Sequence, residues 1–252
     1  MIAADEKHIL VTSFWLMSLI IIPVIFLTFL FAWRYRASRN AQYSPHFAHS
    51  TILEIIWWTI PCIVIVILAI MTWTSSYRLD PYQDLPIANK KPITIEAIAL
   101  QWKWLFIYPE QNIATINYIQ FPVNVPIRFL ITAEGPMNSF QIPSLAGQIY
   151  AMAGMQTQLH LIANEIGDYP GVSANFTGDG FSDMTFTARV STPAQFDEWV
   201  RTVKKSSLKL SSMVFQQLLK PSKKNTVQYF SSANQNLFKN EMMKSMMPMG
   251  EV

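Results

Sequence analysis

Two long uncharged segments constrain this chain more than any other feature. Residues 9–33 and residues 55–77 contain no Asp, Glu, Lys or Arg. A helix needs about 20 consecutive, predominantly apolar residues to cross the hydrocarbon core of a bilayer. Both segments are longer than the apolar core of a signal peptide, and neither ends in a small-residue cleavage site. The sequence therefore predicts two transmembrane helices, in agreement with a charged fraction of only 14%.

The segment between the two uncharged runs predicts the orientation of these helices. It carries Arg34, Arg36 and Arg39 and no acidic residue before Glu54. Short loops rich in Arg and Lys remain on the cytoplasmic side of the membrane. Residues 1–78 are therefore predicted to form a transmembrane helical hairpin, with both the N-terminus and the large C-terminal portion outside the cytoplasm.

Residues 93–192 show the period of a β-sheet. The segment IRFLIT alternates apolar and polar side chains from Ile127, and MTFTARV does the same from Met184. Gly and Pro turn signals separate such short runs along this part of the chain. The pattern predicts an antiparallel, all-β sandwich or barrel of ordinary domain size.

Two other segments flank the predicted sandwich. Residues 79–92 are rich in Pro, Asp and Asn and are predicted to be a linker. After Thr192, a Thr-Pro helix start opens a C-terminal helical arm over residues 193–252. Nine of the 19 Lys and Arg residues fall from Arg201 onward, but a solvated basic face explains them best. A net charge of +3 is too small to predict nucleic-acid binding.

The composition of the predicted sandwich excludes copper. Mononuclear blue-copper sites need two histidines and a cysteine, and binuclear copper sites need two thiolates. Cys62 is the only cysteine and lies in an apolar run, and His160 is the only histidine after residue 62. Neither kind of site can be built, and His160, in an alternating segment, is predicted to be structural.

Three other groups of residues could carry chemistry. Glu54 lies beside the second apolar run, where burial of a carboxylate is costly and often functional, although it could also reach headgroup water. An alternating aromatic run could relay electrons or dock a partner, but it more often forms one packed face of a strand. A methionine-rich tail could bind Cu(I), but methionine is also an ordinary packing residue. The aromatic run is Trp102, Trp104, Phe106 and Tyr108, and the tail methionines are Met242, Met243, Met246, Met247 and Met249.

Several motifs together resemble one family. The chain contains FAWRYRAS, KPITIE, QWKWLFIYPEQNIATIN and MNSFQIPSLAGQIYAMAGMQTQLHLIAN. These segments, which follow a predicted two-helix hairpin, closely resemble subunit II of the cytochrome o ubiquinol oxidases, in the haem–copper oxidase superfamily. The resemblance covers nearly the whole chain. It implies a cupredoxin-like sandwich and a C-terminal aromatic-rich helical arm.

The resemblance also implies that a binuclear copper centre has been lost. The cytochrome c oxidase relatives hold this centre, CuA, with two cysteines, two histidines, a glutamate and a methionine. Asn138, before Ser139-Phe140, takes the place of the first histidine, and only the methionine of the later motif survives. Trp102 corresponds to the tryptophan that passes electrons to CuA in those relatives. The lost copper-ligand positions are Asn138, Ser173, Asn175, Thr177, Phe181 and Met184.

The resemblance implies that the chain would be the non-catalytic second subunit of a proton-pumping ubiquinol oxidase that reduces oxygen to water. Subunit I, which would be its main contact, would hold the haem and copper, while this subunit would hold no cofactor. Its other partners would be the remaining oxidase subunits and membrane lipid, with ubiquinol as the substrate of the complex and no role for cytochrome c or nucleic acid. It would reside in the bacterial inner membrane with its sandwich in the periplasm.

Two further expectations concern Glu54 and the N-terminus. Glu54 stands seven residues before Pro61, the spacing that the family shows for a glutamate at the mouth of a proton channel. Well-known members are made with a lipoprotein signal that ends in a lipid-modified cysteine, and no cysteine lies near Met1. Either the short N-terminal tail is translocated with the first helix, or the printed sequence begins after the true start.

A rival interpretation from another functional class is a stand-alone, membrane-tethered β-sandwich that binds an extracytoplasmic partner. It predicts a chain that is stable alone in detergent, with no haem-containing protein attached. A third interpretation, a copper-bearing cytochrome c oxidase subunit, is excluded by the count of possible ligands.

Overall fold

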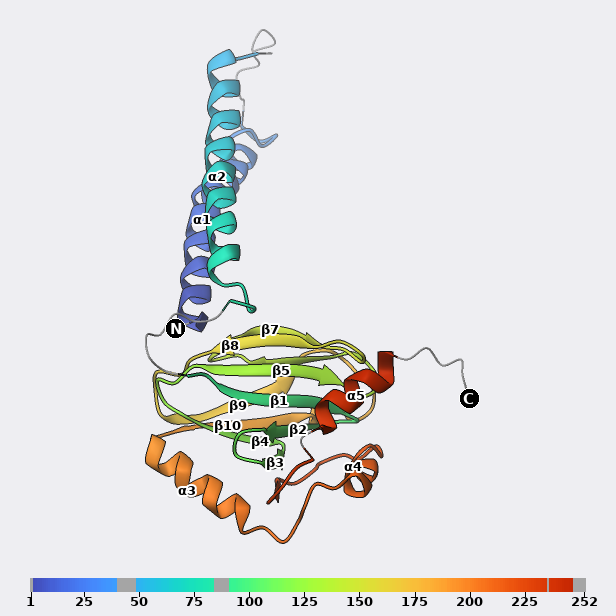
Figure 1. Cartoon of the computed structure of the whole chain (residues 1–252). Coiled ribbons are helices and arrows are strands. Elements are labelled where there is room, and N and C mark those ends of the chain that lie inside the picture. Colours follow the sequence, from blue (N-terminus) through green and yellow to red (C-terminus); the bar gives the residue numbers. More distant parts are fainter. Residues whose placement is uncertain (1, 40–48, 84–90, 235, 247–252) are drawn as a thin grey trace. The chain divides into compact units, whose positions relative to one another are not determined.

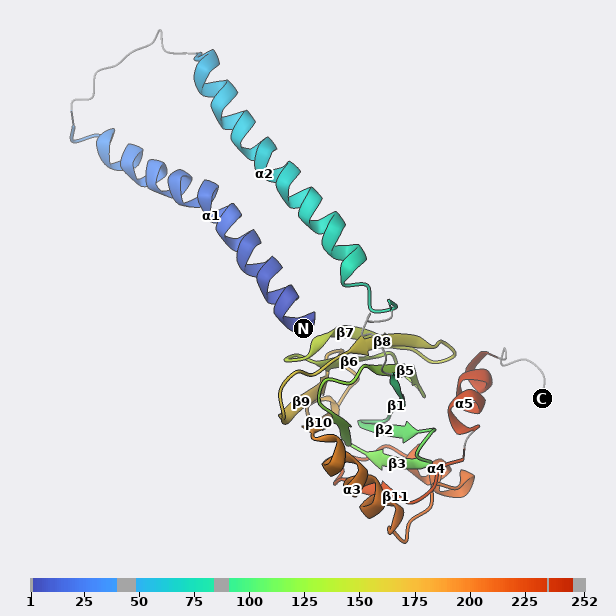
Figure 2. The ribbon, with the colours of Figure 1, turned by 60° about the vertical axis from the view of Figure 1, so that its left-hand side comes forward.

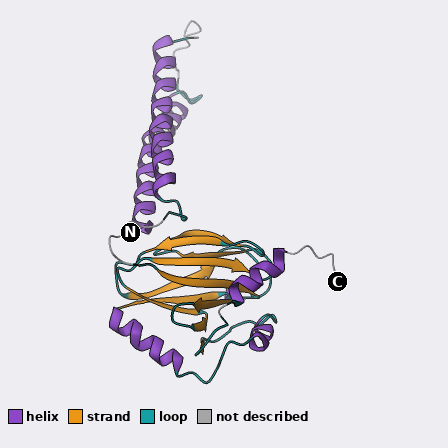
Figure 3. Ribbon diagram, viewed as in Figure 1, coloured by secondary structure: helices purple, strands orange, loops and turns teal. Residues whose placement is uncertain are grey.

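The computed structural model describes residues 2–39, 49–83, 91–234 and 236–246. The chain divides into two compact units, one of residues 4–80 and one formed mainly by residues 81–252. Figure 1 shows the elements along the chain, and Figure 3 separates the helical hairpin and the helical arm from the strands.

The first unit is the predicted helical hairpin. Helix α1 (Ile2–Arg34) and helix α2 (Thr51–Arg78) are both long and apolar enough to cross a membrane. Most large apolar side chains along both helices are exposed, so this surface requires lipid or other helices to cover it. Arg78 Nη2 lies 3.4 Å from Asp5 Oδ1, an ion pair that joins the two helices where the hairpin opens.

The second unit contains eleven strands among its described residues. They are β1 (Ile93–Leu100), β2 (Lys103–Tyr108), β3 (Ile113–Ile116), β4 (Tyr118–Pro122), β5 (Ile127–Ala133), β6 (Asn138–Ile142), β7 (Ala146–Ala151), β8 (Thr157–Leu161), β9 (Gly167–Ser173), β10 (Thr185–Ser191) and β11 (Gln228–Phe230). The order in one sheet is β11-β3-β2-β1-β5-β8, and the order in the other is β4-β10-β9-β6-β7. Figure 2 shows the two sheets enclosing the core of this sandwich.

The sandwich is mixed rather than purely antiparallel, which corrects the prediction. Strand β1 pairs in parallel with β5, and β4 pairs in parallel with β10. In each case other strands intervene in the sequence, so the chain can return to the same end of the sheet before the second strand begins. Period-two alternation reports which face a side chain occupies, and it carries no information on the direction of the neighbouring strand.

Aromatic side chains fill the space between the two sheets. The rings of Trp104 and Phe106 on β2 pack against Phe140 on β6 and Phe186 on β10, and all four are buried. Ring centroids 5.1 to 6.2 Å apart are typical of stabilising aromatic pairs. The predicted inward residues of β5 and β10 also face this core.

The C-terminal arm covers parts of both sheets. Its helices are α3 (Pro193–Lys204), α4 (Ser212–Leu218) and α5 (Leu237–Met246). Phe215, Phe230 and Phe238 join Ile98 and Leu105 in a second apolar cluster on the other face of the six-stranded sheet. The arm is therefore part of the folded unit.

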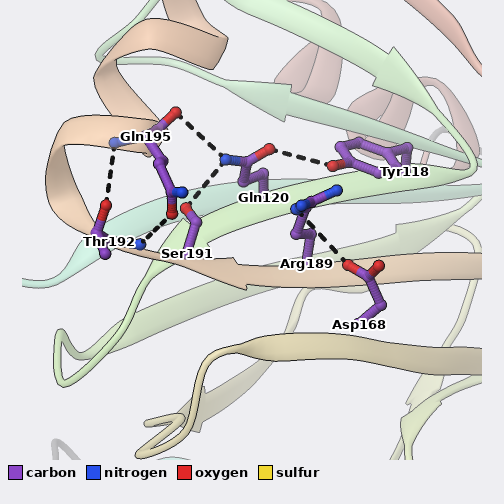
Figure 4. A network of polar contacts seen from close by, with 7 residues as sticks. All are labelled: Tyr118, Gln120, Asp168, Arg189, Ser191, Thr192 and Gln195. Carbon is purple, nitrogen blue, oxygen red and sulfur yellow. Dashed lines mark hydrogen bonds and ion pairs between the residues drawn. The ribbon is translucent and has the colours of Figure 1, made fainter.

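Helix α3 begins on the edge of the five-stranded sheet. Thr192 and Gln195 form a capping box, in which each side chain bonds the backbone of the other residue. Gln120 Nε2 donates to Ser191 Oγ at 2.9 Å and to Gln195 O at 3.4 Å, which ties the helix start to β4 and β10 (Figure 4). Arg189 and Asp168 form an exposed ion pair beside this network.

Candidate functional site

The end of the sandwich where the resemblance places the lost copper-ligand positions contains a buried polar pair. Asn138 begins β6 and Ser173 ends β9, and both side chains are almost fully buried. Ser173 Oγ donates to Asn138 Oδ1 at 3.0 Å, and Asn138 Nδ2 donates to Pro136 O at 3.0 Å. The two side chains satisfy each other where burial without a partner would be costly.

The other candidate positions lie on the loop of residues 174–184 that follows Ser173. The Ser173 backbone N–H donates to Met184 O at 3.2 Å, and the Met184 side chain is fully buried in the core. Asn175 Nδ2 donates to Met137 O at 2.8 Å. The structure thus brings Asn138, Ser173 and Met184 to one place.

Thr177 and Phe181 make different contacts on the same loop. The Thr177 carbonyl accepts a hydrogen bond from Trp102 Nε1 at 3.0 Å. The Phe181 ring packs edge-on against Phe176, with centroids 5.6 Å apart. These two positions stabilise the loop through a backbone group and a ring, and their side chains supply neither a thiolate nor an imidazole.

Trp102 lies in the turn between β1 and β2 rather than in a strand. Its φ of 60° is left-handed, which few non-glycine residues adopt. A Cβ added at Gly180 would lie 2.3 Å from Trp102 Cδ2, so the loop backbone rests directly on the indole. The prediction that the aromatic run forms one strand face holds for Trp104, Phe106 and Tyr108 and is wrong for Trp102, because the turn reverses the chain there.

Residues 220–225 of the arm, which we call the clasp, contact this turn and the residue that follows it. Lys103, only 3% exposed, donates through Nζ to Lys220 O at 3.0 Å and to Ser222 Oγ. Burial lowers the pKa of Lys103. Lys223 Nζ lies 3.3 Å from Asp179 Oδ2 and 5.6 Å from the centroid of the Trp102 ring. The clasp therefore connects the arm to both the turn and the loop.

Sequence reasoning missed Lys103. A lysine at the start of a strand is usually solvated, and its burial here depends on an arm segment more than a hundred residues away. Its neighbours in the sequence give no signal of a contact with a residue 117 positions away.

The donor chemistry of this end does not fit a copper centre. The six candidate positions present amides, hydroxyls, a phenyl ring and one thioether, whereas copper in such sites takes thiolate and imidazole ligands. Across the described residues, no group of three or more His, Cys, Asp or Glu side chains is arranged to hold a metal ion.

Glu54 lies in the first turn of α2, where a negative charge interacts favourably with the helix dipole. His49 Nδ1 is 3.5 Å from Glu54 Oε1, and the two side chains are 88% and 49% exposed. The rest of the chain therefore leaves about half of the Glu54 side chain uncovered.

Three family models match successive parts of the chain. Residues 2–74 match the transmembrane domain of cytochrome c oxidase subunit II, residues 111–190 match its periplasmic domain, and residues 204–249 match the COX aromatic rich motif. Subunit 2 of the cytochrome bo(3) ubiquinol oxidase of Pseudomonas aeruginosa is 48% identical over 94% of this chain and 72% of its own length. The ubiquinol oxidase subunit 2 of Acetobacter aceti is 49% identical over 92% of this chain and 76% of its own length.

The chain belongs to the ubiquinol oxidase subunit 2 family. A subunit of this family is one component of a terminal oxidase complex and has other oxidase subunits as partners. The sandwich is cupredoxin-like, as the resemblance predicted, and follows two helices that can span the membrane. The periplasmic domain of subunit II of the Bradyrhizobium japonicum cytochrome oxidase is 25% identical, with a TM-score of 0.45, over 47% of this chain and 98% of that domain.

The remaining predictions for this family member concern His160 and the methionine tail. His160 lies on β8 and donates from Nδ1 to Pro81 O at 2.9 Å, which ties the start of the predicted linker to the sheet. Met242, Met243 and Met246 lie in α5, so part of the tail is helical. Met247, Met249 and linker residues 84–90 lie outside the described residues.

Proposed function

We propose that this chain is the non-catalytic second subunit of a ubiquinol oxidase that reduces oxygen to water and translocates protons. Its hairpin would pack against subunit I, which would carry the haem, the copper and the quinol chemistry. Its sandwich would lie in the periplasm and cap subunit I without carrying electrons. The buried Asn138–Ser173 hydrogen bond is the observation that best supports this role.

The physical basis is that hydrogen bonds perform the cross-linking that a metal would otherwise supply. In a copper-bearing sandwich, ligands from two segments are fixed by coordination to the same ions. Here Asn138 and Ser173 link β6 to β9, Trp102 supports the loop, and the clasp of residues 220–225 fixes Trp102. Such a domain can remain rigid without thiolates, but it offers no group that changes redox state during turnover.

Purification of the intact complex through a tag on this chain tests the proposal. We expect rapid quinol-dependent oxygen uptake, no oxidation of reduced cytochrome c, and copper in the amount that subunit I alone accounts for. A Trp102→Phe variant should retain quinol oxidase turnover, since no electron passes through this indole. Additional copper that is lost when the sandwich is removed, or rapid cytochrome c oxidation, would contradict the assignment.

We further propose that Glu54 collects protons for subunit I from the cytoplasmic side, which requires the basic loop after α1 to face the cytoplasm. Its exposure and its place directly before the uncharged segment of α2 support this role. Glu54→Gln should slow turnover and proton uptake severalfold because the amide cannot bind and release a proton. Glu198→Gln, on the exposed face of α3, is the matched control and should leave both rates unchanged. Equal rates in both variants would exclude Glu54 from the proton path.

A further inference from the structure

The open end of the helical hairpin contains a pocket between α1 and α2. It has a volume of about 230 Å³ and is lined by six residues from the two helices. This volume is below the roughly 300 to 1,000 Å³ of pockets that enclose whole drug-sized ligands, so it suits a small polar group. The lining residues are His8, Ile9, Met71, Thr74, Ser75 and Arg78.

The pocket lies at the level where hydrocarbon gives way to water. The first uncharged run begins directly after His8, and the second ends directly before Arg78. Exposed Trp73 and Tyr77, whose ring centroids are 5.3 Å apart, are the residue types that concentrate at this interface. In a membrane, phospholipid headgroups occupy the same level.

The residues that line the pocket change from apolar to polar and charged along the helices. Ile9 and Met71 lie toward the uncharged runs, whereas His8 and Arg78 lie at their outer boundary. A phospholipid has the same order, with acyl chains on the membrane side and a polar headgroup on the water side. The pocket therefore matches the headgroup and the beginning of the chains.

The charges at the pocket favour a headgroup that carries both signs. Arg78 lines the pocket, and its Nη2 lies 3.4 Å from Oδ1 of Asp5 next to the pocket, so a guanidinium and a carboxylate lie side by side. A guanidinium has five N–H donors, and one carboxylate contact leaves others for a phosphate. The carboxylate can accept hydrogen bonds from an ammonium group. A purely anionic headgroup would satisfy the guanidinium but would be repelled by Asp5.

The hydroxyl groups support the same choice. Thr74 Oγ1 donates to Ile70 O at 3.0 Å and lies 3.1 Å from Met71 O, so its remaining capacity is as an acceptor. The last turn of α2, which ends at Arg78, also has the negative end of the helix dipole. Both features favour a positively charged hydrogen-bond donor.

We propose that this pocket binds the headgroup of a zwitterionic phospholipid with a primary ammonium group. Its phosphate contacts Arg78 and His8, its ammonium contacts Asp5 and Thr74, and its acyl chains lie along Ile9 and Met71. The site is independent of the proposed electron and proton roles of the subunit.

The test uses the intact oxidase complex, depleted of lipid in detergent and then incubated with one phospholipid at a time. Native mass spectrometry counts the lipids that remain bound after phosphatidylethanolamine, phosphatidylcholine or phosphatidylglycerol is added. Ser75→Trp fills the pocket without removing a charge, and Ser76→Trp, on the neighbouring hydroxyl outside this pocket, is the matched control. Arg78→Gln and His8→Ala then remove the phosphate donors.

We expect the wild type to retain one more phosphatidylethanolamine per complex than Ser75→Trp, with Ser76→Trp like the wild type. The affinity for phosphatidylcholine should be about tenfold lower than that for phosphatidylethanolamine, because its quaternary ammonium cannot donate hydrogen bonds. Arg78→Gln and His8→Ala should lower phosphatidylethanolamine occupancy without changing haem content. Equal lipid counts in Ser75→Trp and the wild type, preferential retention of phosphatidylglycerol, or displacement by inorganic phosphate alone would overturn the proposal.

Discussion

Single buried polar groups stabilise the end of the sandwich where Asn138 and Ser173 lie. Asn138 and Ser173 are buried together at this end of the sandwich and use each other as hydrogen-bond partners. A net hydrogen bond of this kind contributes about 1 kcal/mol, while an unpartnered buried group costs about 1 to 3 kcal/mol. The pair therefore avoids a penalty, and each member depends on the other.

Glu96 is the residue whose protonation should affect stability most clearly. It lies on β1 between Ile107 of β2 and Leu130 of β5, and burial raises its pKa from the ordinary 4.5 to about 7. The folded state therefore binds the Glu96 proton more tightly than the unfolded state. Stability from this group is fully present below pH 4.5 and is lost as the pH rises toward about 7.

Glu96→Gln removes this pH dependence. At pH 8 the variant should unfold with a free energy about 1 to 2 kcal/mol higher than the wild type, after a discount for solvent screening of a partly exposed group. Chemical unfolding of the full chain in detergent at pH 4.5 and pH 8 measures the difference. The difference should be small at pH 4.5. A gain of the same size at both pH values would show that the effect is not caused by ionisation.

At the scale of elements, three segments behave as one assembly. They are the β1–β2 turn, the loop of residues 174–184 and the clasp of residues 220–225. Trp102 contributes its indole N–H to the loop, and the Trp102 carbonyl lies 3.5 Å from Asn225 Nδ2 of the clasp. Lys103 Nζ donates to Lys220 O and so joins the clasp to the start of β2. A change in any one element should therefore be transmitted to the other two.

Gly180→Ala tests this coupling. The added Cβ would lie 2.3 Å from the indole of Trp102, so either the loop or the ring must move. Overpacking of this kind costs about 1 to 3 kcal/mol. We expect lower stability of the full chain and faster amide hydrogen exchange both in the loop and in the clasp.

Gly167→Ala is the matched control for this variant. Its added Cβ would meet only Tyr169, at an ordinary van der Waals distance of 3.7 Å. It should leave exchange in the loop and the clasp unchanged. Faster exchange in the loop alone for Gly180→Ala would show that the clasp is independent of it.

At the scale of the whole molecule, the helical hairpin cannot bury its own apolar surface. Val64 is the only residue of the two described helices that is buried, and large apolar side chains line both helices. In the membrane, lipid and the helices of partner subunits would cover this surface. The hairpin therefore predicts stable association within a larger complex.

A tagged chain expressed in a host that makes the oxidase should co-purify with a haem-containing partner through detergent washes. The absorption spectrum of the eluate measures this association. A truncated control that lacks residues 1–80 should lose most of the haem, because it lacks the apolar surface. A full chain that elutes alone and stably folded would favour the rival, a stand-alone membrane-tethered sandwich.

The sequence predicts much of the fold because burial periodicity is local. Uncharged runs predicted α1 and α2, alternation predicted the inward faces of β5 and β10, and the Thr192-Pro193 start predicted α3. The parallel pairing of β1 with β5 could not be predicted in this way, since pairing depends on the path between strands. The left-handed turn at Trp102 was missed because alternation continues through its neighbours.

Residue identity alone limits the chemistry of the sandwich, because residues 93–192 contain one histidine and no cysteine. Only the tertiary structure decided which polar groups of this domain become hydrogen-bond partners. The Asn138–Ser173 bond and the buried Lys103 join segments that are 35 and 117 residues apart in the chain. Such contacts form when packing excludes water and buried polar groups must find partners within the protein, which a linear pattern of residues cannot reveal.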